Sequence, residues 1–146
     1  WIDGESITEK LNKNGIKVLA NSNVKLTIDD KIIYLAGIED TTTRTPDIEK
    51  ALEQTKNPII LLSHSPDVFP IVPNDVNLTL AGHVHGGQVR LPLFGALVVP
   101  SNYGDKYSQG LIKEKGKQMI VTKGIGNSIF NVRFNCVPEI VVIEFE

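Results

Sequence analysis

The sequence has little cysteine, few histidines and no long apolar run. Its single cysteine, Cys136, excludes an internal disulfide. No apolar stretch approaches the roughly 20 residues of a membrane-spanning helix. The net charge is −2 and no basic block occurs, so neither nucleic acid nor an anionic membrane surface is indicated as a partner. The chain opens at Trp1 and its only methionine is Met119, so we expect further residues upstream, which could include an export signal or anchor.

The segment at residues 78–88, Leu-Thr-Leu-Ala-Gly-His-Val-His-Gly-Gly-Gln, joins an apolar strand to two histidines and a glycine pair. In an extended segment His83 and His85 would point to the same face. Gly86 and Gly87 permit positive φ angles and close approach to a ligand. They form either a tight turn or a backbone nest for a phosphate oxygen. The segment therefore predicts half of a metal site.

A second apolar stretch, residues 58–62, leads to the third and last histidine, His64. All three histidines thus follow the ends of two predicted strands, where ligands gather in open α/β sheets. Neutral imidazole is a good ligand for zinc, manganese and iron. Asp67 follows in the sequence Ser-Pro-Asp, and we interpret it as a helix cap rather than a ligand.

The remaining pattern predicts an α+β fold of about seven to nine strands and two clear helices, with a mixed sheet flanked by helices on one side. One helix is expected from Asp3 or Ser6 to residue 13, and another from Thr45 to about Lys56. Residues 89–100 are strand-like but interrupted by proline and glycine. The other predicted strands are residues 16–19, 24–28, 31–37, 58–62, 78–82, 110–113, 118–122 and 139–146.

The residues around two of the histidines resemble a known family. Leu-Ser-His-Ser-Pro-Asp around His64 and Ala-Gly-His-Val-His-Gly-Gly-Gln around His83 resemble the calcineurin-like metallophosphoesterases. The likeness is strongest to the bacterial phosphodiesterases that are similar to UDP-diacylglucosamine hydrolase. Residues 91–101 and 133–140 also resemble that branch. The resemblance implies a four-layered αββα sandwich with a two-metal site at one end.

Of the family's five metal-binding blocks, only the fourth and fifth occur here. The strings Asp-x-His, Gly-Asp-x-x-Asp and Gly-Asn-His-Asp/Glu are absent from the sequence. We therefore interpret residues 1–146 as the C-terminal portion of the domain, with half of its sandwich core exposed and the N-terminal half as its partner. The resemblance implies that His64 and His83 bind one metal ion and His85 the other. It implies two divalent ions as cofactors, with manganese favoured over iron or zinc.

The resemblance implies a metal-dependent phosphoesterase, above all a phosphodiesterase, in which a hydroxide activated by two metal ions attacks the phosphate. Three neutral imidazoles cannot balance two divalent cations, so carboxylates must come from the missing half. We expect this chain alone to be inactive. The alternative is a non-catalytic scaffold or binding module of the same fold. The substrate and the location stay open: cytoplasmic, or membrane-associated through the missing N-terminus and facing outward in a bacterium.

No catalytic residue is predicted in this half, but four residues are candidates for contacting the substrate. Gly86 and Gly87 are two of them. Asn102 either lines the substrate groove or belongs to a plain polar loop. Arg133 could hold phosphate through a bidentate fork, and a structural salt bridge is an equally good interpretation. Cys136 is interpreted as a small core residue.

Overall fold

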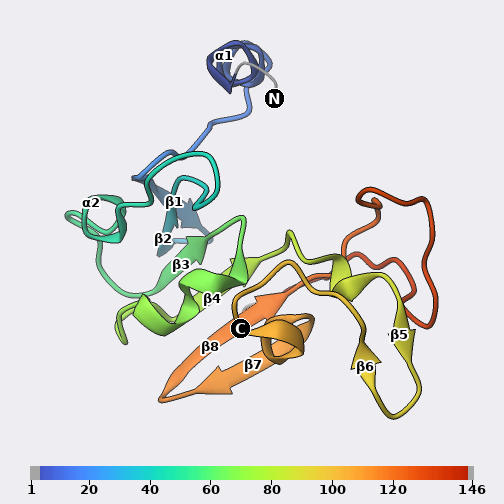
Figure 1. Ribbon diagram of the computed structural model, residues 1–146. Helices are drawn as coiled ribbons and strands as arrows, with labels where there is room; N and C mark the ends of the chain where they lie inside the picture. Colours follow the sequence, from blue (N-terminus) through green and yellow to red (C-terminus); the bar gives the residue numbers. More distant parts are fainter. Residues whose placement is uncertain (1–3, 145–146) are drawn as a thin grey trace.

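A mixed six-stranded sheet forms the centre of the computed structural model, which describes residues 4–144 (Figure 1). The predicted α+β class is confirmed. The strands are β1 (Ser22–Ile28), β2 (Lys31–Gly37), β3 (Ile59–Leu62), β4 (Leu78–Ala81), β5 (Arg90–Leu91), β6 (Gly95–Ala96), β7 (Gly110–Glu114) and β8 (Lys117–Val121). The order in the large sheet is β1-β2-β3-β4-β8-β7, and β5 pairs with β6 alone. The pairs β2–β3, β3–β4 and β4–β8 are parallel, while β1–β2 and β7–β8 are antiparallel hairpins.

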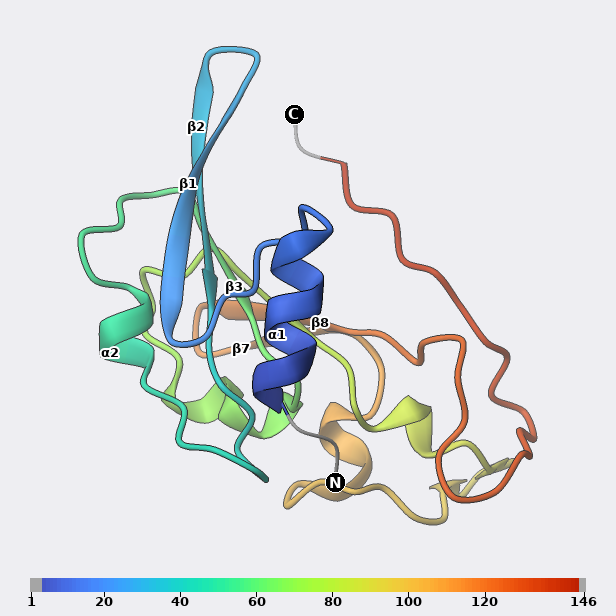
Figure 2. The same ribbon diagram turned by 90° about the horizontal axis from the view of Figure 1, so that it is seen from above.

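The helices are short apart from the first. Helix α1 (Gly4–Lys13) stands away from the sheet and has no buried residue (Figures 1 and 2). No helix among residues 4–144 is long and apolar enough to cross a membrane. The other helical elements are α2 (Ile48–Ala51) and the 3-10 turns η1 (Pro66–Ile71), η2 (His85–Gly87) and η3 (Gly104–Tyr107).

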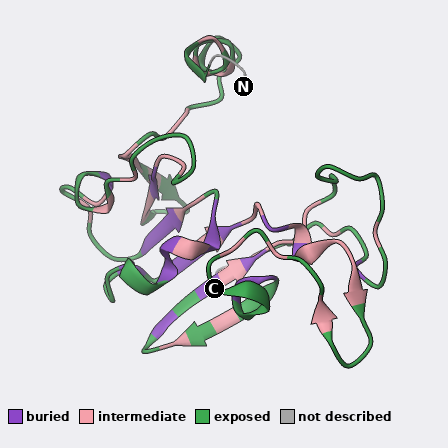
Figure 3. Cartoon of the chain, viewed as in Figure 1, coloured by how far each residue is buried: buried purple, intermediate pink, exposed green. Residues whose placement is uncertain are grey.

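One face of the sheet carries the core. The buried residues are concentrated in the central strands (Figure 3). The buried side chains of β2, β3, β4 and β8 on this face pack against α2, η1 and η3. Lys117 fixes the end of η1, because its buried ammonium donates to three backbone carbonyls of that turn at 2.8–3.0 Å. The core is made up of Ala36, Ile38, Ala51, Ile59, Leu61, Val68, Val72 and Val76 in one cluster, and Phe69, Ala81, Val84, Tyr107, Met119 and Val121 in another.

The opposite face of the sheet is apolar but only partly covered. The register aligns Leu62, Leu80 and Ile120 across three strands, and each of them is half-buried. A pocket of about 420 Å³ opens over Leu62 and Leu80 and reaches His64. A second pocket of about 340 Å³ continues it over Ile120. The sheet therefore has one face with a packed core and one face without.

Two predicted elements near the start of the chain differ from the structure. Residues 16–19 form no strand, since the chain there is not paired with the sheet. The second helix begins after Asp47 rather than Thr45, because the Asp47 carboxylate accepts from the amide of Lys50 at 2.9 Å. It also ends at Ala51, earlier than predicted. In the first helix Ser6 lies inside the first turns, so it is not the cap, and the rival cap Asp3 lies outside the described residues.

The predicted final strand is also wrong over the part that the structure describes. Residues 139–144 run without strand pairing. The segment is held instead by Glu139, whose carboxylate accepts from the amide of Lys123 at 3.0 Å and pairs with its ammonium at 2.9 Å. The predicted strands at 31–37 and 58–62 and the hairpin at 110–122 are confirmed within a residue or two.

Candidate metal centre

The candidate centre lies where the parallel strands β2, β3 and β4 end side by side. His64 follows β3 by two residues and His83 follows β4 by two. The amide of Gly82 donates to the carbonyl of His64 at 3.2 Å, so the two segments stay together beyond the strands. The two imidazole rings meet with centroids 4.4 Å apart and planes tilted by 51°. The predicted gathering of histidines beyond the strand ends is confirmed for this pair.

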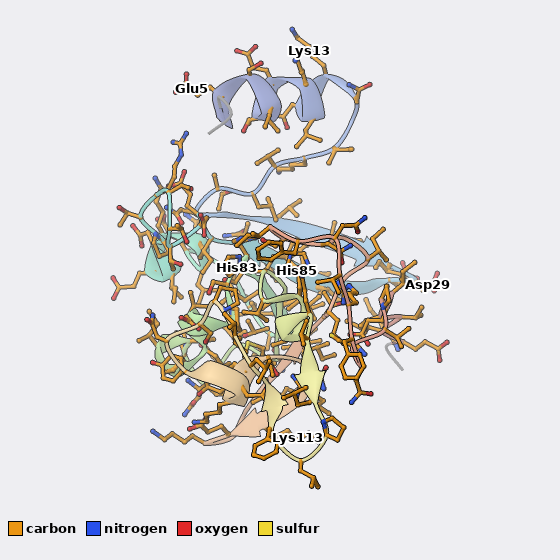
Figure 4. All side chains as sticks on the ribbon, turned by 45° about the vertical axis from the view of Figure 1, so that its right-hand side comes forward. Glu5, Lys13, Asp29, His83, His85 and Lys113 are labelled. Atoms are coloured by element: carbon orange, nitrogen blue, oxygen red, sulfur yellow. The ribbon has the colours of Figure 1, made fainter. Side chains whose placement is uncertain are left out.

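The loop that carries His83 and His85, which are labelled in Figure 4, is curled rather than extended. The φ angles are 69° at His83, 50° at His85, 63° at Gly86 and 75° at Gly87. Residues other than glycine rarely adopt positive φ, and such strain is concentrated at functional sites. The expectation of an extended segment with both imidazoles on one face is therefore wrong. His83 turns instead to His64.

Both histidines of this loop are held in the neutral form. Burial lowers the pKa of His83, and the nearby His64 lowers it further, against the opposing effect of Asp40 and Asp67. Burial also lowers the pKa of His85, and the charge of Arg133 adds to that effect. Neutral imidazole is the form that binds a metal ion. The electrostatics of the loop therefore favour ligand chemistry over a buried imidazolium.

Arg133 is tied into the loop that follows β8. Among residues 4–144 it forms no ion pair, so the described residues offer no partner for the structural salt bridge. The bidentate phosphate contact stays a prediction, although the donors are engaged within the chain. The guanidinium donates to the carbonyls of Lys123 at 2.8 Å, Gly124 at 3.3 Å, Gly126 at 2.6 Å and Cys136 at 3.2 Å, and to the side chain of Asn127 at 3.1 Å.

The glycine pair is required by packing. A Cβ on Gly86 would lie 2.7 Å from the sulfur of Cys136, and one on Gly87 would lie 2.5 Å from the Cβ of Ala96. The Gly87 amide already donates to the carbonyl of Val84 at 2.7 Å. These contacts favour the tight turn over the phosphate nest. They also confirm Cys136 as a core residue, since its side chain is buried.

The sequence predicted that Asp67 caps a helix, and this prediction is wrong, because Asp67 holds a neighbouring loop instead. The cap is Ser65, whose hydroxyl accepts from the amide of Asp67 at 3.2 Å. The Asp67 carboxylate accepts from the hydroxyl of Ser101 at 2.5 Å and from the amide of Asn102 at 2.8 Å. Asn102 thus keeps an exposed side chain on a loop that is tied to Asp67, whose charge acts on His83.

Sequence reasoning missed a carboxylate at the same edge. Asp40 follows β2 by three residues, and its Oδ2 accepts from the amide and the hydroxyl of Thr43 at 3.2 and 2.9 Å. Its Oδ1 is buried and has no hydrogen-bond partner among the described residues. Burial alone would raise the pKa of Asp40, but hydrogen bonds from Thr42 and Thr43 and the nearby His64 lower it. Its place just beyond a predicted strand was the signal that could have found it.

These residues fit part of a metal centre. Two adjacent imidazoles and a buried carboxylate oxygen without a donor suit a divalent cation. Across residues 4–144, however, no group of three or more histidine, cysteine, aspartate or glutamate side chains converges closely enough to hold an ion. The described residues thus supply part of a ligand set and not a whole one.

Comparison with curated proteins agrees with the histidine motifs. The chain is 34% identical to the uncharacterized metallophosphoesterase YkuE of Bacillus subtilis, over 88% of the chain and 46% of the relative. It is 32% identical to the phosphodiesterase YaeI of Escherichia coli, over 94% of the chain and 50% of that relative. The chain belongs to the calcineurin-like metallophosphoesterases.

This metallophosphoesterase chain spans about half the length of the curated relatives it matches first. That coverage agrees with its interpretation as the C-terminal half. A transmembrane protein with a metallophosphoesterase domain from Danio rerio is 37% identical over 60% of the chain and 23% of its own length. No family model matches the chain. No solved structure matches it either.

Proposed function

We propose that the protein containing this chain is a metal-dependent phosphodiesterase. The observation that carries the proposal is the meeting of His64 and His83 at the ends of adjacent parallel strands, with ring centroids 4.4 Å apart. It occurs in a chain whose relatives bear the names metallophosphoesterase and phosphodiesterase. The adjoining loop supplies a third neutral imidazole, His85.

In this proposal His64 and His83 bind one metal ion and His85 binds a second. The curled loop supports this division, because it turns His83 towards His64 while His85 sits beside Arg133. Two divalent ions, with manganese favoured, would withdraw charge from the phosphate and lower the pKa of a water molecule. The chain's own part is to keep His83 and His85 neutral and to fix the direction of the imidazoles.

We further propose that residues 1–146 are the C-terminal portion of the domain and that the N-terminal half covers the open face of the sheet. Half-buried Leu62, Leu80 and Ile120 and the pocket of about 420 Å³ beside His64 support this arrangement. The N-terminal half would also bring the carboxylates that three neutral imidazoles need for charge balance. The 146-residue chain alone should therefore not hydrolyse substrate.

Among the proposed substrate contacts, Asn102 has the most direct support. Its side chain is exposed, and its backbone is held by Asp67, whose charge acts on His83. Gly86, Gly87 and Arg133 act in this proposal by shaping the loops around the phosphate.

The test is hydrolysis of bis(p-nitrophenyl) phosphate by the full-length protein, with and without added Mn²⁺. We expect activity that depends on metal and that falls by more than about 100-fold in His83→Ala, the cost of removing a group that positions the reacting centre. Lys113→Ala, at an exposed site on β7, is the matched control and should keep full activity. Full activity in His83→Ala would refute the assignment. If the wild type hydrolyses nothing either with or without Mn²⁺, a non-catalytic scaffold of the same fold is favoured.

A further inference from the structure

Asp40 has a buried oxygen, Oδ1, that accepts no hydrogen bond of ordinary geometry from the described residues, although the Thr42 amide lies close enough to the carboxyl to lower its pKa. Buried polar atoms in folded proteins almost always have a hydrogen-bond partner, so each exception calls for an explanation. Thr43 satisfies the other oxygen, Oδ2, through its amide and its hydroxyl. The two contacts fix the direction of the carboxylate. Oδ1 therefore has a fixed direction, and no side chain of the described residues donates a hydrogen bond to it.

The backbone brings Asp40 to His64. Strands β2 and β3 are parallel neighbours, and the pairing continues beyond β2 because the amide of Ile38 donates to the carbonyl of Leu62 at 3.2 Å. Asp40 follows Ile38 by two residues, and His64 follows Leu62 by two. The register pairs Gly37 with Leu62, so Asp40 lies one position further along than His64. The two residues thus follow the neighbouring ends of adjacent parallel strands. The nearby His64 contributes to the lowered pKa of the Asp40 carboxyl, which agrees with this placement.

The other acids near this edge are already engaged. Asp67 accepts from Ser101 and from the amide of Asn102. Glu39 pairs with Arg44 at 3.7 Å and lies against the side chain of Asn21. Among the described acids at this edge, Asp40 is the one with an oxygen left over.

We propose that Asp40 is a positioning residue for His64: its Oδ1 accepts the imidazole N–H of His64 that points away from the metal ion. This inference rests on the proposed function of the site. A carboxylate in that position fixes the tautomer and the orientation of a metal-binding imidazole and makes it a better ligand. Its negative charge also offsets part of the cation's charge, which three neutral imidazoles cannot do. In this proposal Asp40 acts through His64 rather than as a ligand.

The experiment uses the full-length protein with Asp40→Asn and Asp40→Ala. Mn²⁺ binding is measured by calorimetry, and the imidazole ¹⁵N shifts of the three histidines are recorded without metal and with Zn²⁺. We expect Asp40→Ala to weaken Mn²⁺ binding by about 10- to 100-fold at unchanged stoichiometry, the usual effect of losing such a partner. The ¹⁵N shifts of His64 should change towards a mixture of tautomers. Asp40→Asn, which keeps an acceptor oxygen but loses the charge, should fall between Asp40→Ala and the wild type.

Two variants serve as controls. Asp75→Asn removes an exposed acid elsewhere and should change neither the affinity nor the shifts. Thr43→Val removes one donor to Oδ2 and leaves Oδ1 in place, so it separates loosening of the loop from loss of the carboxylate. If Asp40→Ala does not fold, the Mn²⁺ affinity and the His64 ¹⁵N shifts of Asp40→Asn decide the question. Thermal unfolding then checks that Asp40→Asn is folded.

Wild-type affinity and unchanged His64 shifts in both Asp40 variants would overturn the proposal. Loss of one metal ion from the stoichiometry would also overturn it, because Asp40 would then be a ligand. Failure of the proposed function looks different: the wild type would bind no metal, while the metal-free ¹⁵N shifts would still report whether Asp40 and His64 are in contact.

Discussion

Gly87→Ala tests whether the glycine pair is there for packing, and its cost can be worked out from the structure. The φ angle at Gly87 is +75°, and a left-handed conformation costs an alanine about 1–2 kcal/mol. The new Cβ would also lie 2.5 Å from the Cβ of Ala96 and 3.0 Å from the carbonyl oxygen of Val98. Forcing a methyl group into a packed site costs about 1–3 kcal/mol more. We expect Gly87→Ala to lower the free energy of unfolding by about 2–5 kcal/mol.

Gly116→Ala is the matched control. Gly116 has nearly the same φ, +80°, but nothing lies within 4 Å of its missing Cβ. The free energy of unfolding of Gly116→Ala should fall only by the cost of the left-handed backbone, about 1–2 kcal/mol. Urea unfolding of both variants of the full-length protein measures the difference, and calorimetry measures Mn²⁺ binding. We expect weaker metal binding in Gly87→Ala alone, because the β5–β6 hairpin would be pushed off the histidine loop. Equal destabilisation in the two variants would refute the packing argument.

Two further predictions concern buried and paired charges elsewhere. Lys117→Met should destabilise the protein by about 2–3 kcal/mol in urea unfolding, because three carbonyls of η1 lose the ammonium that they bind; wild-type stability would show that water replaces it at no cost. For Asp105, burial alone would raise the pKa, but hydrogen bonds from Arg90 and Ser108 lower it. Its contribution to stability is therefore complete above the unfolded-state pKa of about 3.9 and is lost as the pH falls through the lower pKa of the folded state. The stability difference between wild type and Asp105→Asn should shrink in that acid range, and a difference independent of pH would contradict the assignment.

Sequence reasoning located the strands that pair with a neighbour in the sequence and those that are rich in apolar and β-branched residues. Residues 31–37 are mostly apolar, lie between a turn and a glycine, and pair with the preceding strand, so the local pattern was sufficient. The hairpin at 110–121 was equally clear from its Lys-Gly turn. Residues 16–19 and 139–144 have strand composition, yet none of them pairs with the sheet in the described chain. Composition cannot reveal whether a neighbouring strand is available.

The candidate site was predictable in its location but not in its geometry. The placement of His64 and His83 followed from the apolar strands before them. The curl of residues 82–88 depends on contacts with distant segments, including the sulfur of Cys136, and no local pattern encodes them. Asp40 was overlooked because its significance is a missing partner, which only a structure can show.

The histidine loop is held in place from two sides before any metal binds. Gln88 donates to the carbonyls of Phe130 and Val132 at 3.1 and 3.2 Å, which joins the loop to the segment after β8. Arg90 donates to the carbonyl of Gly86 at 3.0 Å and pairs with Asp105 at 2.7 Å, which joins it to η3. Because these bonds already fix the strained backbone, metal binding need not supply the free energy to order it. The positive φ angles of His83 and His85 are therefore supported by bonds to two other parts of the folded chain.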